Sequence, residues 1–256
     1  MKKLIVFDLD GTLAESKQAI DEEMAHLIAD LLDILSVAVI SGGDWSQFEK
    51  QVLDHLPANA RTSNLSILPT SGTKFYRFTG QWAQVYAEDF SESERSTVLQ
   101  SLDEAVSEAG LLETRIWGDQ IEDRGTQITF SGLGQKAPPA EKAKWDYDHV
   151  KRNTLKALLD KKLNNFAVRI GGSTSIDITR PGVDKALGMR RLAEQTGIET
   201  GDMLFIGDAL YPGGNDAPMR DAGISSIWVN DVAQTKLVIE TLVKSNGGQV
   251  SLATTN

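Results

Sequence analysis

The sequence predicts an α/β protein: a doubly wound core built on a parallel sheet, with an α+β domain inserted into the middle of the chain. Near both ends, short apolar runs stop at acidic or glycine-rich turns, and longer amphipathic runs of helical period follow them. This alternation is typical of parallel strands joined by crossover helices. In the middle of the chain, the strand candidates are instead aromatic-rich or alternate between polar and apolar residues.

The core strands are expected where apolar, often β-branched residues run continuously, as in strands buried on both faces. These runs are residues 4–7, 37–40, 203–206 and 226–229. Helical patterns follow at 16–33, 44–55, 185–196 and 233–245. The last of these has Asp231 as a candidate N-cap and Gly247 near its end. Together these elements predict a Rossmann-like core.

The inserted domain is expected over residues 82–183, which leaves residues 1–81 and 184–256 for the core. Helical stretches at 92–109 and 149–162 lie among candidate strands at 75–79, 83–87, 127–130, 167–170 and 175–179. Antiparallel strands with helices on one face fit an α+β domain better than a continuation of the parallel sheet.

Composition excludes several classes of function. The chain has no cysteine, which excludes thiol catalysis and thiolate metal sites. Its 26 basic and 36 acidic residues give a net charge of −10, which argues against nucleic acid or an anionic membrane surface as the main partner. The apolar run of residues 31–40 is interrupted by polar residues and is too short for a membrane span. We expect a cytoplasmic protein.

Carboxylates follow two of the expected core strands. Asp8 and Asp10 come directly after the first strand, and Asp208 follows the strand at 203–206, with Asn215 and Asp216 further along the same loop. Ligand-binding residues of open α/β sheets gather at the carboxyl ends of strands. Clustered carboxylates repel one another unless a cation lies among them, and an all-oxygen site suits Mg²⁺. Alone, the first motif could instead be an N-capping Asp-Gly turn with no further role.

These motifs, with Ser41-Gly42-Gly43 after the second strand and Asp184-Lys185 before a helix, resemble in order and spacing the haloacid dehalogenase superfamily of phosphotransferases. The resemblance implies that Asp8 is the nucleophile, Asp10 the acid/base, and Lys185 the cation that balances the phosphate. It also implies that Ser41 and Gly42 bind phosphate, and that Asp8, Asp208 and the Asp10 carbonyl hold Mg²⁺. Asn215 and Asp216 would lie behind these ligands, where Asp216 would hold Lys185 or a metal-bound water.

The resemblance narrows to the second subclass, the sugar-phosphatase type with an α/β cap, and is closest to the eukaryotic-type phosphomannomutases. It is carried by residues 207–216 and by two segments of the inserted domain, 122–135 and 171–177. Arg124, Ser175 and Asp177 match the positions that meet the substrate's second phosphate and its sugar. Taken singly, such residues are usually solvated surface groups.

Three positions depart from the mutase pattern. Gln135 stands where an arginine is expected, and Lys142 and Lys17 replace two others. A guanidinium grips phosphate with two parallel hydrogen bonds, whereas an ammonium is a point charge. We therefore expect a Mg²⁺-dependent phosphatase that acts on a sugar phosphate or a similar small metabolite through an aspartyl-phosphate. The alternatives are a phosphomannomutase-type mutase and a catalytically silent ligand- or partner-binding module. A homodimer is one possible assembly.

Overall fold

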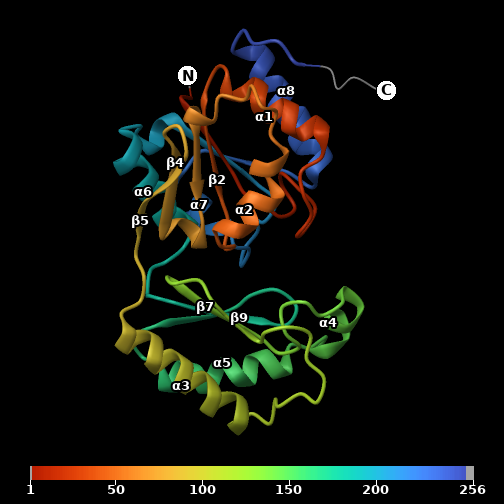
Figure 1. Ribbon diagram of the computed structural model, residues 1–256, viewed down its shortest axis with the longest axis vertical. Helices are drawn as coiled ribbons and strands as arrows, with labels where there is room; N and C mark the ends of the chain where they lie inside the picture. Colours follow the sequence, from red (N-terminus) through yellow and green to blue (C-terminus); the bar gives the residue numbers. More distant parts are fainter. Residues whose placement is uncertain (1, 252–256) are drawn as a thin grey trace. The chain divides into compact units, whose positions relative to one another are not determined.

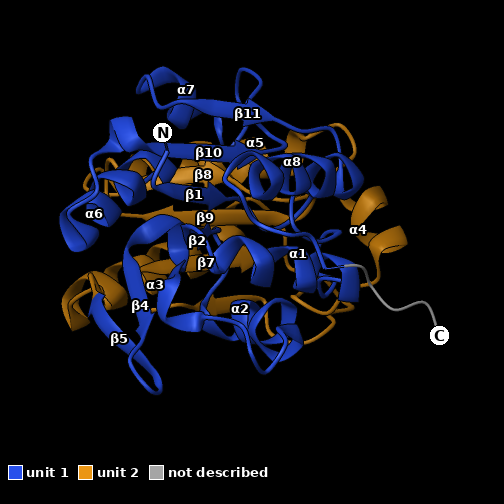
Figure 2. Cartoon of the chain, turned by 90° about the horizontal axis from the view of Figure 1, so that it is seen from above, with its two compact units in different colours: residues 1–86, 184–256 blue, residues 87–183 orange. Residues whose placement is uncertain are grey.

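The computed structural model describes residues 2–251 and divides into two compact units (Figure 2). The core unit comprises residues 1–86 and 184–256, and the inserted unit comprises residues 87–183. The first boundary lies five residues beyond the expected one, because the strand at 82–87 belongs to the core sheet.

The core unit is built on a seven-stranded sheet in the order β11-β10-β1-β2-β3-β4-β5. Of these strands, β2, β4 and β5 are labelled in Figure 1. All strands from β11 to β3 are parallel, and β4 is antiparallel to β3. The strands are β1 (Leu4–Phe7), β2 (Ser36–Ile40), β3 (Leu65–Leu68), β4 (Lys74–Phe78), β5 (Trp82–Ala87), β10 (Met203–Gly207) and β11 (Ser226–Trp228).

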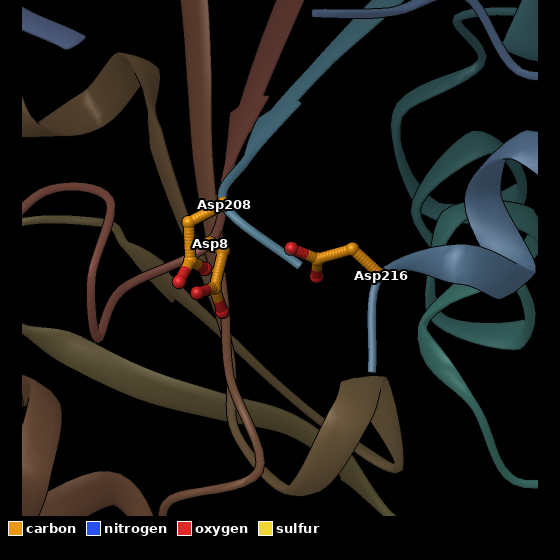
Figure 3. A group of neighbouring side chains, drawn as sticks. All are labelled: Asp8, Asp208 and Asp216. Carbon is orange, nitrogen blue, oxygen red and sulfur yellow. The ribbon is translucent and has the colours of Figure 1, made fainter. Parts of the chain in front are cut away.

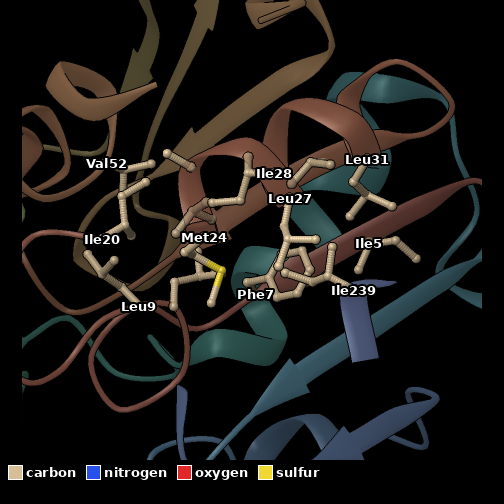
Figure 4. Close-up of a cluster of buried hydrophobic side chains, with 14 of the residues drawn as sticks. Ile5, Phe7, Leu9, Ile20, Met24, Leu27, Ile28, Leu31, Val52 and Ile239 are labelled. Carbon is tan, nitrogen blue, oxygen red and sulfur yellow. The ribbon is translucent and has the colours of Figure 1, made fainter. Parts of the chain in front are cut away.

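Helices cover both faces of this sheet, because successive side chains of each strand point to opposite faces. Ile5 and Phe7 of β1 pack with α1 (Glu22–Leu32), α2 (Trp45–Gln51) and α8 (Val232–Ser245) in one cluster, part of which Figure 4 shows. Leu4 and Val6 pack with α6 (Lys185–Thr196) and α7 (Ala217–Asp221) in another. The predicted doubly wound α/β core is therefore confirmed. Short 3₁₀ turns occupy Leu53–His55, Thr62–Asn64, Thr70–Gly72 and Thr200–Asp202.

The strand β5 was expected in the inserted domain, and aromatic packing explains why it joins the core. The Trp82 ring lies 5.6 Å from Trp45 and 5.5 Å from Phe78, between ring centroids. The Tyr86 ring stacks on Phe75 at 5.8 Å. These contacts join β5 to neighbouring elements of the core, so the chain leaves the core only after Tyr86.

The inserted unit is a four-stranded antiparallel sheet in the order β6-β7-β9-β8, with two long helices packed on one face. Its strands are β6 (Ile121–Asp123), β7 (Gln127–Ser131), β8 (Ala167–Ile170) and β9 (Ser175–Thr179). Its helices are α3 (Glu92–Glu108), α4 (Pro139–Trp145) and α5 (Val150–Lys162). Ile128, Phe130, Ile176 and Ile178 form the apolar side of the sheet, so the alternate residues lie on its polar face.

Some elements differ from the sequence expectation. The first helix begins at Glu22 rather than near residue 16, because Asp21 caps it by accepting a hydrogen bond from the Met24 N–H at 2.9 Å. The strands β3 and β6 and the helices α4 and α7 were not expected. Among the helices of residues 2–251, none combines the length and the apolar character that crossing a bilayer requires.

Candidate active site

The core sheet brings three of the expected residues to one edge. β1 lies between β10 and β2, with Phe7 paired to Ile206 on one side and to Val39 on the other. Because the three strands are parallel and in register, the residues that follow them, Asp8, Asp208 and Ser41, leave the same edge of the sheet. This is the edge at which open α/β sheets bind their ligands.

Lys185 is the buried cation of this edge. It is the first residue of α6, whose N-terminus Asp184 caps by accepting a hydrogen bond from the Leu187 N–H at 2.8 Å. Its Nζ donates to Asp8 Oδ1 and, at 2.5 Å, to Asp216 Oδ1. The side chains of all three residues are at most 4% exposed. A buried lysine is tolerable only with such partners, and here it is neutralised by two.

A close glycine contact lets α6 approach the sheet far enough for Lys185 to reach this position. A Cβ built on Gly72 would lie 2.4 Å from the Gly188 Cα, and one built on Gly188 would lie 2.5 Å from Ile40 Cδ1. Neither position has room for a side chain. The packing of α6 thus depends on the absence of side chains at both positions.

Burial and neighbouring charges together set the protonation of the cluster. Burial raises the pKa of the Asp8 carboxyl to about 7, against the opposing effect of Lys185 and with a contribution from the Asp216 charge. Burial acts to lower the pKa of Lys185, but the Asp8 and Asp216 carboxylates outweigh it, so this pKa is raised. Burial and the Asp216 charge also raise the pKa of Asp208. Near neutral pH, both the protonated and the ionised form of Asp8 are therefore populated in the metal-free protein.

The donor set fits a hard divalent cation. One carboxylate oxygen each from Asp8, Asp208 and Asp216 lies within 4.8 Å of the others, and Figure 3 shows their side chains converging. Both oxygens of Asp216 are already engaged, Oδ1 by Lys185 and Oδ2 by the Ala209 N–H at 3.0 Å. Asp8 and Asp208 are thus the side chains best placed to hold Mg²⁺. Gly11 makes room for Asp208, since a Cβ there would lie 2.5 Å from Asp208 Oδ2.

The Asp10 carboxylate is held by donors on both oxygens. The Lys17 N–H donates to Oδ1 at 2.6 Å, and Gln47 Nε2 donates to Oδ2 at 2.8 Å. Gln51 Nε2 lies 3.4 Å from Oδ1 and also donates to the Gln18 carbonyl. The main chain of Lys17 thus contacts Asp10, whereas its side chain is exposed.

The loop that contains Ser41 and Gly42 is braced by the turn after β3. The Ser71 N–H donates to the Ser41 carbonyl at 2.8 Å, and the Thr70 N–H donates to the Gly43 carbonyl at 2.9 Å. Thr70 and Ser71 have φ of 49° and 58°, in the left-handed region that non-glycine residues seldom adopt. Backbone strain of this kind persists where surrounding contacts enforce it and is common at functional sites.

In the inserted unit, Ser175, Asp177 and Arg124 lie around the polar face of the sheet. Asp177 pairs with Thr129 across β9 and β7 and accepts a hydrogen bond from the Thr129 hydroxyl at 2.7 Å. Burial raises the pKa of Asp177. Arg124 forms an ion pair with Glu122 at 2.7 Å. This face presents hydroxyl, carboxyl and guanidinium groups suited to a polar substrate.

The remaining candidates lie around these groups. Lys142 donates from Nζ to the Gln135 carbonyl at 3.1 Å, so these two inserted-unit residues are neighbours. Asn215 is exposed in the loop after β10, whereas Asp216 beside it is fully buried.

Sequence reasoning missed Gln47 and Gln51. Glutamine has no distinctive chemistry, and neither residue belongs to a motif. The available signal was their spacing: four residues apart on the helix that follows Ser41-Gly42-Gly43, they share one helix face.

A doubly wound core with a buried lysine between carboxylates at its strand ends defines an α/β enzyme with an acidic active site. The chain belongs to the haloacid dehalogenase-like hydrolase family, whose model matches residues 5–246. Members of this superfamily generally use Mg²⁺. The family resemblance drawn from the motifs is thereby confirmed.

Named relatives extend the comparison. The chain is 28% identical over 229 residues to a phosphomannomutase of Encephalitozoon cuniculi, covering 84% of this chain and 83% of that protein. It is 27% identical over 221 residues to the phosphomannomutase of Schizosaccharomyces pombe, covering 84% of each. Among solved structures, an IMP-bound mutant of the Plasmodium falciparum IMP-nucleotidase has a TM-score of 0.67 at 18% identity, covering 96% of this chain and 67% of that one. This last likeness concerns the fold.

Proposed function

We propose that this protein is a Mg²⁺-dependent phosphatase that hydrolyses a sugar phosphate or a similar small phosphorylated metabolite through an aspartyl-phosphate on Asp8. The observation that carries the proposal is the buried contact of Lys185 with Asp8 and Asp216 beside Asp208. A carboxylate held against a fixed cation is oriented for in-line attack, and the cation can offset charge on the transferring phosphoryl group.

Each candidate site residue of the core unit named below has a role in this reaction. Asp8 attacks phosphorus and forms the P–O bond as the bond to the leaving oxygen breaks. Asp10 gives its proton to the leaving oxygen and then takes one from a water, whose oxygen bonds to phosphorus as the bond from Asp8 to phosphorus breaks and phosphate departs. Ser41 and Gly42 offer hydrogen bonds to the phosphoryl oxygens, and Asp216 keeps Lys185 in place. A bound Mg²⁺ would be held by Asp8, Asp208 and the Asp10 carbonyl, and would supply further positive charge next to the phosphoryl group.

The inserted unit would bind the rest of the substrate. Ser175 and Asp177 offer a hydroxyl and a carboxyl to sugar hydroxyls, and Arg124 offers a guanidinium to an anionic group. Asp177 is already oriented by Thr129, which supports a binding role over that of a freely solvated surface charge. Lys142 and Lys17 would supply weaker point charges.

Phosphomannomutase activity is the second candidate, because the curated relatives described above carry that name and match most of the chain. The two activities differ only in the acceptor, which is water in one and a hydroxyl of a second sugar phosphate in the other. We favour water because Gln135 puts a neutral carboxamide where a mutase would hold the distal phosphate.

One experiment separates these readings. The enzyme is incubated with Mg²⁺, mannose 1-phosphate and a trace of hexose bisphosphate, and free phosphate and mannose 6-phosphate are both measured. We expect phosphate release with little interconversion, a Gln135→Arg variant that retains the bisphosphate more tightly, and an Asp8→Asn variant that releases none. Efficient 6-phosphate formation without free phosphate would establish the mutase. If a panel of phosphorylated metabolites bound equally to wild type and to Asp8→Asn without turnover, a binding module would remain.

A further inference from the structure

We propose that Gln47 is a positioning residue that orients the Asp10 carboxyl for proton transfer, an inference that rests on the proposed role of Asp10 in phosphoryl transfer. Its Nε2 donates to Asp10 Oδ2 at 2.8 Å, while the Lys17 N–H donates to Oδ1 at 2.6 Å. All three residues belong to the core unit.

The two donors together fix the plane of the carboxyl group. The terminal torsion of an aspartate is broad, so a carboxyl without donors samples a wide range of orientations. Because one N–H lies on each oxygen, rotation about the Cβ–Cγ bond of Asp10 would break both hydrogen bonds. Gln47 is also uncharged, so it can donate to Oδ2 whether or not Asp10 carries its proton.

The other end of the Gln47 carboxamide lies against Gly43. A Cβ built on Gly43 would lie 1.9 Å from Gln47 Oε1 and 2.5 Å from its Cδ, so the carboxamide occupies the space that a side chain there would need. The Gly43 N–H in turn faces the Ser41 hydroxyl at 3.3 Å. Gln47 therefore connects Asp10, the proposed acid/base, to the loop proposed to bind phosphate. A shift of Asp10 or of this loop would be transmitted through Gln47 to the other.

The test uses leaving-group dependence. Protonation of the leaving oxygen matters much for an alkyl phosphate and little for an aryl phosphate with an acidic phenol. In Gln47→Met, which removes the donor and keeps the length, we expect kcat on an alkyl phosphate to fall about 10- to 100-fold. On p-nitrophenyl phosphate, kcat should fall by less than about threefold, and KM for both substrates should stay unchanged.

Gly43→Ala displaces the same carboxamide without deleting it. It should reproduce the loss on the alkyl substrate, and the double variant should be no worse than either single one, because both remove one interaction. Glu49→Gln, at an exposed position of the same helix, is the matched control and should behave as wild type. Equal losses on both substrates, or no loss on either, would refute the positioning role.

Crystal structures of the wild type and of Gln47→Met provide a readout that does not depend on turnover. We expect the Asp10 carboxyl to rotate or to become disordered in the variant, and an unchanged carboxyl would overturn the inference. The proposed function fails by a separate result: phosphate release that persists in Asp8→Asn, or wild-type protein with no phosphoryl transfer to any acceptor.

Discussion

Replacing Asp8, the proposed nucleophile, should stabilise the metal-free protein at alkaline pH while it abolishes activity. Asp8 is 3% exposed, and its pKa is raised from the ordinary 3.8 to about 7, chiefly by burial. The folded protein therefore holds this proton more tightly than the unfolded chain does. Stability from this group is complete below about pH 4 and is lost as the pH rises to about 7.

The magnitude follows from the same pKa. Each unit corresponds to about 1.4 kcal/mol, so ionising Asp8 in the folded protein costs on the order of 4 kcal/mol. The carboxamide of the Asp8→Asn variant would carry no charge, yet its carbonyl oxygen could still accept from Lys185. Lys185 would then keep Asp216 as its only carboxylate partner, which offsets part of the gain. We expect Asp8→Asn to be more stable than wild type by about 2 kcal/mol at about pH 8.

Urea unfolding in the presence of a chelator measures this difference. The advantage of Asp8→Asn should shrink by about 2 kcal/mol or more at about pH 5, where less of the penalty remains to be relieved. Excess Mg²⁺ should stabilise wild type more than the variant, because a ligand that binds only the folded state adds to its stability. Asp54→Asn, at an exposed position, should leave the pH dependence unchanged. A variant less stable than wild type at about pH 8 without metal would refute the reasoning.

Two further predictions concern the framework of each unit. Gly188→Ala should destabilise the core by about 1–3 kcal/mol in urea unfolding, since its Cβ would meet Ile40 Cδ1 at 2.5 Å and the Ser71 carbonyl at 2.8 Å, whereas Gly201→Ala, with open space around it, should be neutral. In the inserted unit, the Arg180 guanidinium lowers the pKa of Glu94 to about 2, so this pair adds stability above about pH 4 that is lost as the pH falls toward 2. Glu94→Gln should cost about 1 kcal/mol near neutral pH and flatten this acid dependence, measured by amide exchange in α3.

The core could be predicted from the sequence where local pattern and burial agree. β1, β2 and β10 are short apolar runs that end at polar turns, and the structure places all three side by side inside the sheet, away from its edge strands. The strand β3 was missed because Leu65–Leu68 follows a 3₁₀ turn rather than a long amphipathic helix. The alternation of strands and helices that predicts the other parallel strands is therefore absent before β3. β5 was assigned to the wrong unit because no sequence pattern predicts its ring contacts. Trp82 contacts Trp45, which is distant in the sequence, and Tyr86 contacts Phe75.

The site was predictable to the extent that each residue belongs to a motif. The sequence alone predicts that Asp8 and Asp208 lie close together, because each follows a core strand and neighbouring parallel strands end at the same edge of the sheet. The contacts of Asp10 were beyond such reasoning: the Lys17 N–H reaches it only because residue 17 has φ of 59°. Gln47 reaches it only because α2 begins beside a glycine that leaves space for its carboxamide.

Under the proposed function, residues of the inserted unit would decide which acceptor takes the phosphoryl group. Asp8, Asp10 and Lys185 would perform the same steps toward water or toward a sugar hydroxyl, and the likeness to phosphomannomutases spans both units, so neither separates the two activities. A mutase must retain a bisphosphate while it reorients, and a charge-assisted hydrogen bond contributes about 1.5–3 kcal/mol to such retention. Losing one at Gln135 would shorten retention by about one to two orders of magnitude. A bisphosphate released before the second transfer would leave Asp8 without its phosphoryl group. Weaker binding of the distal phosphate would also leave the aspartyl-phosphate without a bound sugar-phosphate acceptor, so that water would take the phosphoryl group instead.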